Sequence, residues 1–270
     1  MVDMLNKLLL ALFGAAVSAN AFNPCNGSQI ITPENINDIK GCREYHGELT
    51  LDSIFSPDIV SLHHMRELTG ILVLNSYRGE VVFPRSINGT LVIIDVETNN
   101  RVDWYSVRQV SHLVLRSVSA KIDFQLRVTG SIQVTDSSTT SIKGLEATYL
   151  DYLVIYDCPR LYEFQIDGLQ GLTEVSISNT GLKTFDFLKD VVIEEDLQIE
   201  NYKYSELVIQ VRQIGGQIIL SGNRLLYHIF FVALDEFDYV PVLYNNPKLL
   251  FIQLPDMILI LSSSMWNKSY

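Results

Sequence analysis

The fold is decided by residues 150–185, which read LDYLVIYDCPRLYEF at 150–164 and LTEVSISNTGLKTF at 172–185. Both copies contain two aliphatic residues in alternate positions, Leu153/Ile155 in the first and Val175/Ile177 in the second. Alternate residues of a β-strand point to the same face, so each pair predicts a short strand with one buried face. The duplication supplies a register that can be extended along the chain.

Ten such pairs occur, spaced 19 to 23 residues apart. They are Leu49/Leu51, Leu72/Leu74, Leu91/Ile93, Leu113/Leu115, Ile132/Val134, Leu153/Ile155, Val175/Ile177, Leu197/Ile199, Ile218/Leu220 and Val240/Val242. Four positions after the first member of each pair lie Ser53, Ser76, Asp95, Ser117, Asp136, Asp157, Asn179, Asn201, Gly222 and Tyr244. All but Tyr244 are small residues that favour turns.

A second apolar position follows about ten residues after each pair, for example Phe83, Phe124, Phe164, Phe185 and Phe251. Each unit is therefore interpreted as a strand, a polar turn, a second short strand and a return loop. A unit of this kind buries its apolar face only against its neighbours, so the copies must stack. We predict an all-β parallel solenoid of about ten rungs. A leucine-rich repeat is the alternative, and the lack of helix-forming return segments disfavours it.

Composition is that of an ordered protein, with 47% hydrophobic and 19% charged residues. The formal net charge is −11. Without a basic cluster to meet phosphates, nucleic acid is not an expected partner.

Export is predicted from the N-terminus. Residues 1–21 combine a lysine, a short apolar run and a small-residue cleavage site, which is typical of a secretory signal peptide cleaved before Phe22. Asn26, Asn88 and Asn267 each begin an Asn-x-Ser/Thr acceptor for N-glycosylation, and Asn88 is expected in the loop before a strand. The apolar runs elsewhere are too short for a transmembrane helix.

Cys25 and Cys42 flank a segment with helix signals, in which Thr32 is the expected N-cap, Pro33 the first helical residue and Gly41 the stop. A disulfide between the two cysteines would close the first rung beside this capping helix. Cys158 is left over, and a packed thiol is the favoured interpretation.

The segment from Cys25 to Ile30 and from Cys42 to Leu51 resembles the start of a receptor L-type domain. More narrowly, it is similar to the fungal GPI-anchored cell-wall organisation proteins, which include sporulation-specific wall proteins. Residues 172–182 and 245–249 are similar to that family as well. The resemblance covers about residues 23–252.

The resemblance implies a right-handed β-helix that is extracellular, glycosylated and needed for the organisation or integrity of the wall. It carries over no catalytic residue. The family usually continues through a Ser/Thr-rich stalk to an anchor signal, whereas this chain ends at Tyr270 after the short apolar run 257–261. The expected organisation is a signal peptide at 1–21, an L-domain-like solenoid at 22–255 and a tail at 256–270.

Chemistry-bearing motifs are few. The adjacent His63 and His64 lack the spacing of a metal site, and Glu194-Glu195-Asp196 is interpreted as a solvated rim. No catalytic residue, metal or cofactor is predicted. Exposed tyrosines on successive rungs suggest stacking against sugar rings, with Tyr152, Tyr156 and Tyr202 as the candidates, although aromatics that cover the core are the simpler interpretation.

Three functions remain open from the sequence. The favoured hypothesis is a non-enzymatic glycoprotein, secreted or on the cell surface, with wall polysaccharide or surface proteins as partners. The alternatives are a ligand-binding receptor ectodomain, and a polysaccharide-cleaving β-helix enzyme, which would require paired carboxylates.

Overall fold

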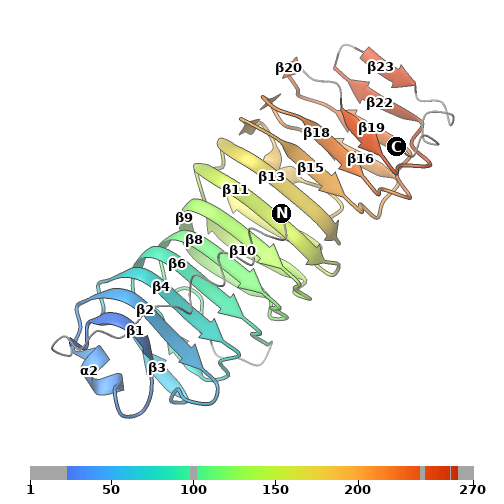
Figure 1. Ribbon diagram of the computed structural model, residues 1–270. Helices are drawn as coiled ribbons and strands as arrows, with labels where there is room; N and C mark the ends of the chain where they lie inside the picture. The colour runs from blue at the N-terminus through green and yellow to red at the C-terminus, as the bar shows by residue number, and fades with distance from the viewer. Residues whose placement is uncertain (1–22, 98–101, 238–240, 256, 261–270) are drawn as a thin grey trace.

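The chain forms an elongated parallel β-solenoid in a computed structural model that describes residues 23–97, 102–237, 241–255 and 257–260 (Figure 1). The predicted all-β solenoid is confirmed. One wall is a continuous sheet in which neighbouring strands are parallel. Its strands are β1 (Asn26–Ile30), β2 (Glu44–Asp52), β4 (Glu67–Asn75), β6 (Ser86–Ile94), β8 (Gln109–Arg116), β9 (Ile122–Thr135), β11 (Tyr149–Cys158), β13 (Gly171–Thr180), β14 (Val192–Ile193), β15 (Leu197–Glu200), β17 (Gln213–Ile214), β18 (Ile218–Ser221), β20 (Glu236–Phe237) and β21 (Val242–Tyr244).

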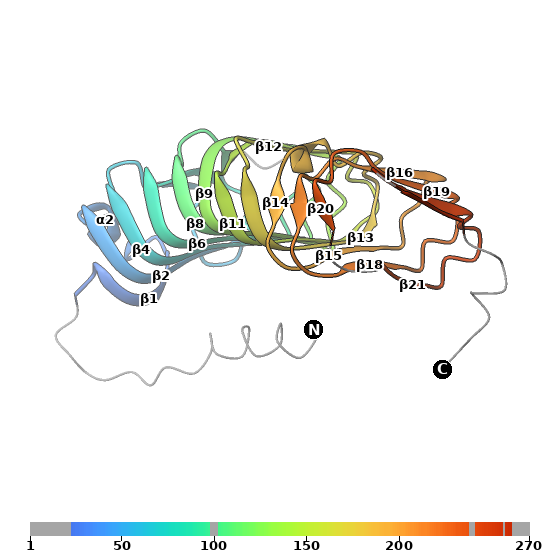
Figure 2. The same ribbon diagram turned by 90° about the horizontal axis from the view of Figure 1, so that it is seen from above.

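The second wall is built in three pieces. They are β3 (Ile59–Ser61), β5 (Glu80–Val82) and β7 (Val102–Asp103); then the first part of β9 with β10 (Ser141–Glu146) and β12 (Glu163–Asp167); then β16 (Glu206–Ile209), β19 (His228–Phe231), β22 (Phe251–Leu254) and β23 (Met257–Ile260). Viewed from above, β12, β16 and β19 lie across the solenoid from β15, β18 and β21 (Figure 2). The pair β22–β23 is antiparallel, so sheet structure continues into the stretch expected as a tail.

The strand register confirms nine of the ten aliphatic pairs. From Leu49/Leu51 to Ile218/Leu220 each pair lies beside the next along the continuous wall, and all are buried. The tenth pair is wrong by one residue, because Leu220 lies beside Leu243 and Val242 is exposed. Val240 lies outside the described residues. The prediction of Phe251 as an inward residue is also wrong by one position, because Ile252 is the buried residue beside Ile229.

The turn after every pair but the first has a left-handed backbone. Its non-glycine residues have φ between 49° and 55° and are Ser76, Asp95, Ser117, Asp136, Asp157, Asn179, Asn201 and Asn245, and Gly222 has a φ of 64°. Ser53, the first residue of the predicted series, does not share this conformation. Asn245 therefore replaces Tyr244 in the predicted series. Short polar side chains tolerate this conformation because they hydrogen-bond locally, which explains the composition of the series.

The residue after each left-handed turn points into the core. These residues are Tyr77, Val96, Val118, Ser137, Cys158, Thr180, Tyr202, Asn223 and Asn246, and all are buried. The polar members bond between rungs: the Asn223 side chain accepts the amide of Tyr202 at 2.8 Å, and the Asn246 side chain accepts the amide of Asn223 at 3.1 Å. Cys158 belongs to this series as a buried free thiol, and burial raises its pKa to about 11.

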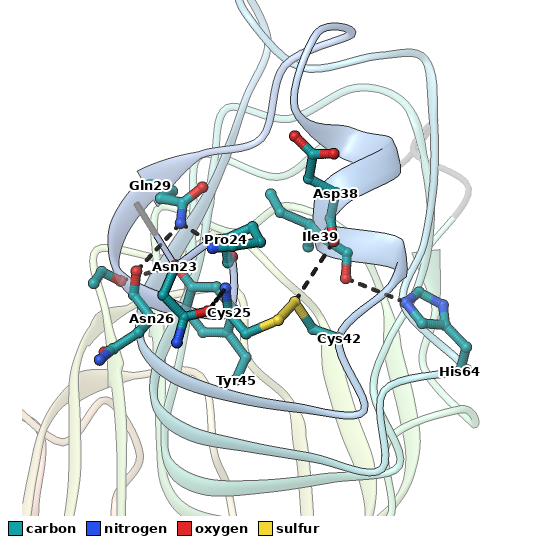
Figure 3. The surroundings of a disulfide bond; sticks show 11 residues. Asn23, Pro24, Cys25, Asn26, Gln29, Asp38, Ile39, Cys42, Tyr45 and His64 are labelled. Carbon is teal, nitrogen blue, oxygen red and sulfur yellow. Dashed lines mark hydrogen bonds between the residues drawn. A yellow bond between two sulfur atoms is a disulfide. The ribbon is translucent and has the colours of Figure 1, made fainter. Parts of the chain in front are cut away.

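The N-terminal end is closed as expected by the disulfide between Cys25 and Cys42 and by the short helix α2 (Ile36–Lys40) (Figure 3). The helix starts later than predicted. The side chain of Asn35 accepts the Thr32 amide at 2.8 Å and donates to the Ile30 carbonyl at 2.8 Å, so these residues form a turn instead of the first helical turn. Strand β1, which the sequence analysis did not predict, extends the wall beneath this cap.

The second wall is interrupted between β12 and β16. Phe185 was expected to belong to a second short strand, but a 3₁₀ helix, η2 (Asp186–Leu188), occupies that rung. The strand prediction is wrong here because Phe185, Phe187 and Leu188 are all buried, and a strand cannot bury the adjacent pair Phe187 and Leu188 on one face.

Candidate functional site

The strongest candidate site is the outward face of the continuous wall around β11. Tyr152 and Tyr156 alternate with inward Leu153 and Ile155, and their side chains are 39% and 48% exposed. Four residues of extended strand separate the two rings by roughly 13 Å. We call the outward residues of β9, β11, β13 and β15 the tyrosine face: Ser131, Gln133, Thr135, Tyr152, Val154, Tyr156, Glu174, Ser176, Ser178, Gln198 and Glu200.

Small hydroxyl residues lie on the rungs beside both tyrosines. Tyr152 lies beside Ser131, and Tyr156 lies between Thr135 and Ser178. These three neighbours are buried and too short to cover a ring that projects from the sheet. The two tyrosine rings therefore project beyond the short polar side chains on the adjacent strands. Phenol rings with a free polar edge are suited to ligands that have both apolar C–H faces and hydroxyls.

One row of this face changes from valine to polar residues at β9. The same outward row on the preceding strands carries Val73, Val92 and Val114, whereas Gln133, Ser176 and Gln198 follow on later strands around Val154. Further along, Glu200 accepts hydrogen bonds from the hydroxyls of Ser221 at 2.6 Å and Tyr244 at 3.3 Å. The face therefore offers carboxylate and amide groups next to the rings.

Tyr202 does not belong to this face. Its side chain is only 4% exposed, and its hydroxyl donates to the carbonyls of Lys183 at 2.7 Å and Glu206 at 3.0 Å. The prediction of Tyr202 as a glycan-stacking residue is wrong because it follows the left-handed Asn201, where side chains turn inward. That signal was present in the sequence, since Tyr77 and Cys158 occupy the same position of their repeats.

The glycosylation acceptors lie away from the tyrosine face. Asn26 and Asn88 are both exposed, and they share one row of the sheet with His46 and Thr69 between them. Asn88 lies inside β6 and not in the loop where it was expected. Asn267 lies outside the described residues.

Two carboxylates of the acidic cluster 194–196 accept hydrogen bonds from other rungs. Glu194 accepts the Tyr149 hydroxyl at 2.7 Å, and Asp196 accepts the Gln217 amide at 2.7 Å, so both carboxylates hold neighbouring rungs together. Within the described ranges, no group of three or more histidine, cysteine or acidic residues is placed to hold a metal ion. The described helices include none long and apolar enough to cross a membrane.

The sequence identified the two exposed tyrosines but missed the rest of the face. Ser131, Thr135 and Ser178 carry no motif of their own, and only the strand register shows which of the many small polar residues lie beside the rings.

No family model, curated protein or solved structure matches the chain in the comparisons with known proteins.

Proposed function

We propose that this protein is a non-enzymatic glycoprotein, secreted or held at the cell surface, that binds wall polysaccharide through the tyrosine face and contributes to the organisation of a fungal cell wall. The observation that carries the proposal is the pair of exposed rings, Tyr152 and Tyr156, on one strand among short hydroxyl residues. The predicted signal peptide, the glycosylation acceptors and the resemblance to wall proteins support the same assignment.

The physical basis is stacking supplemented by hydrogen bonds. A pyranose ring presents C–H groups on its faces and hydroxyls at its edge, and it fits against an aromatic ring with polar groups beside it. The distance of roughly 13 Å between the two tyrosines requires an extended ligand, so a polysaccharide chain fits this face better than a single sugar.

The test is co-sedimentation of residues 22–270 with β-glucan, chitin or mannan particles, before and after enzymatic removal of N-glycans. We expect retention on at least one polysaccharide, without sugar released into the supernatant. Substituting both Tyr152→Ala and Tyr156→Ala removes two stacking contacts of about 1 kcal/mol each and should weaken retention roughly tenfold to thirtyfold.

The matched control substitutes Tyr105→Ala and Tyr227→Ala, which removes two exposed rings outside the tyrosine face. Equal loss in both double variants would argue against a specific face. Release of sugar would identify a polysaccharide-cleaving enzyme instead, and the absence of both retention and release would favour a receptor-type ectodomain with a protein ligand.

A further inference from the structure

Strand β12 has an open edge in the middle of the solenoid. It pairs with β10 on one side, and the next rung carries η2 where a strand would continue the wall. In the part of the chain that the structure describes, no backbone hydrogen bond joins β12 to residues 182–190. An unpaired strand edge exposes backbone donors and acceptors and is a template for a further strand.

A groove of about 330 Å³ lies along this edge, between β12 and the segment that contains η2. Phe164 and Phe187, which are in edge-to-face contact with ring centroids 5.1 Å apart, both line the groove. Tyr162, which is 60% exposed, lines it as well. The groove thus places aromatic rings beside an edge of β12 that has no backbone partner in residues 182–190. Strand β12 lies on the wall opposite β15 (Figure 2).

The polar lining of the groove is acidic. It includes Glu163, Asp167 and Asp186, and no lysine or arginine. Glu163 is paired with Lys143, at 2.7 Å between the carboxylate oxygen and Nζ. Asp167 and Asp186 accept only neutral side-chain donors, from Gln165 and Thr184, and no described cation pairs with either.

We propose that this groove is a β-augmentation site for an extended basic segment of a partner protein. The partner's backbone pairs with the open edge of β12, and a lysine or arginine side chain lies in the groove between Asp167 and Asp186. Two carboxylates without a cation favour a positively charged occupant over an acidic or neutral one. The site is independent of the polysaccharide face, since it lies on the other wall and uses different residues.

The first test uses fluorescence anisotropy with the whole exported chain and a labelled Lys-Val-Lys-Val-Lys peptide at constant ionic strength. We expect saturable binding that a Glu-Val-Glu-Val-Glu peptide does not reproduce. Substituting both Asp167→Asn and Asp186→Asn should weaken binding at least tenfold. The matched control, Glu44→Gln with Asp235→Asn, changes the net charge equally at two exposed positions outside the groove and should leave the affinity within twofold.

The second test does not depend on variants. Hydrogen exchange of the wild-type chain should slow at residues 162–167 when the basic peptide is added, and remain unchanged at residues 171–180. Absence of saturable binding, equal loss in the two double variants, or protection confined to the tyrosine face would each overturn the proposal. Binding of the peptide should also persist in the Tyr152→Ala, Tyr156→Ala variant, which separates this site from polysaccharide retention.

Discussion

Tyr156 and Tyr202 lie two rungs apart beside the same turn of the repeat, yet their surroundings are opposite. Tyr156 precedes the left-handed turn and points outward, whereas Tyr202 follows it and is buried. The hydroxyl of Tyr202 satisfies the carbonyls of Lys183 and Glu206, which flank the interrupted rung. Position relative to the turn, more than residue type, therefore decides which tyrosines can meet a ligand.

At the same scale we predict that Tyr202→Phe lowers the free energy of unfolding by about 1 kcal/mol, because two part-buried carbonyls lose their donor. Urea unfolding followed by circular dichroism measures the change, with Tyr156→Phe as a control that should alter stability little. Polysaccharide retention should be unaffected by Tyr202→Phe. A variant of unchanged stability that no longer sedimented with polysaccharide would return Tyr202 to the binding site.

At the scale of the element, the repeat was predictable wherever both inward positions of the strand are aliphatic. Nine aliphatic pairs could be placed because burial selects Leu, Ile and Val at alternate positions. The register failed at β21, where Pro241 is buried, Leu243 lies beside Leu220, and the exposed Val242 imitated the pattern. The strand edge at β12 could not be predicted, because it depends on η2 replacing a strand in the neighbouring rung.

A row of glycines in the first four strands of the continuous wall lies where the backbones of neighbouring rungs approach closely. Gly27, Gly47, Gly70 and Gly89 lie in one row with positive φ. A Cβ on Gly70 would lie 2.0 Å from the Gly47 carbonyl oxygen, whereas a Cβ on Gly27 would meet nothing within 4 Å. Both substitutions carry a cost of about 1–2 kcal/mol for the left-handed backbone, and Gly70→Ala adds a backbone clash.

We therefore expect Gly70→Ala to destabilise the chain by roughly 2 kcal/mol more than Gly27→Ala, a difference on the scale of an overpacked site. The difference in urea midpoint between the two variants measures the clash separately from the backbone strain. Equal effects would mean that neighbouring rungs can move apart at this row.

At the scale of the whole molecule, buried phenols in the first rungs and near the interrupted rung connect stability to alkaline pH. Burial raises the pKa of Tyr45 beneath the N-terminal cap, raises that of Tyr77 to about 12, and raises that of Tyr202 near the interrupted rung. Each hydroxyl donates to a carbonyl, and for Tyr45 the acceptor is Gly27 at 2.8 Å. A charged phenolate would be desolvated there and would face a carbonyl oxygen, so the folded chain retains the three protons.

The unfolded chain releases these protons near pH 10, so the folded state binds more protons above that pH and stability must fall as pH rises. The stabilisation from the three protonated phenols is fully present below about pH 10. Above that pH, the free energy of unfolding should decrease by roughly 1.4 kcal/mol per pH unit for each tyrosine. The decrease for a given tyrosine ends when the pH reaches its pKa in the folded chain. Urea midpoints between pH 8 and pH 11 measure the slope, and tyrosinate absorbance should show three of the 13 tyrosines ionising only as the chain unfolds. Tyr77→Phe should reduce the slope. If all the tyrosines ionised near pH 10 while the circular dichroism stayed native, the three phenols would be accessible to water and the rungs around them would open without global unfolding.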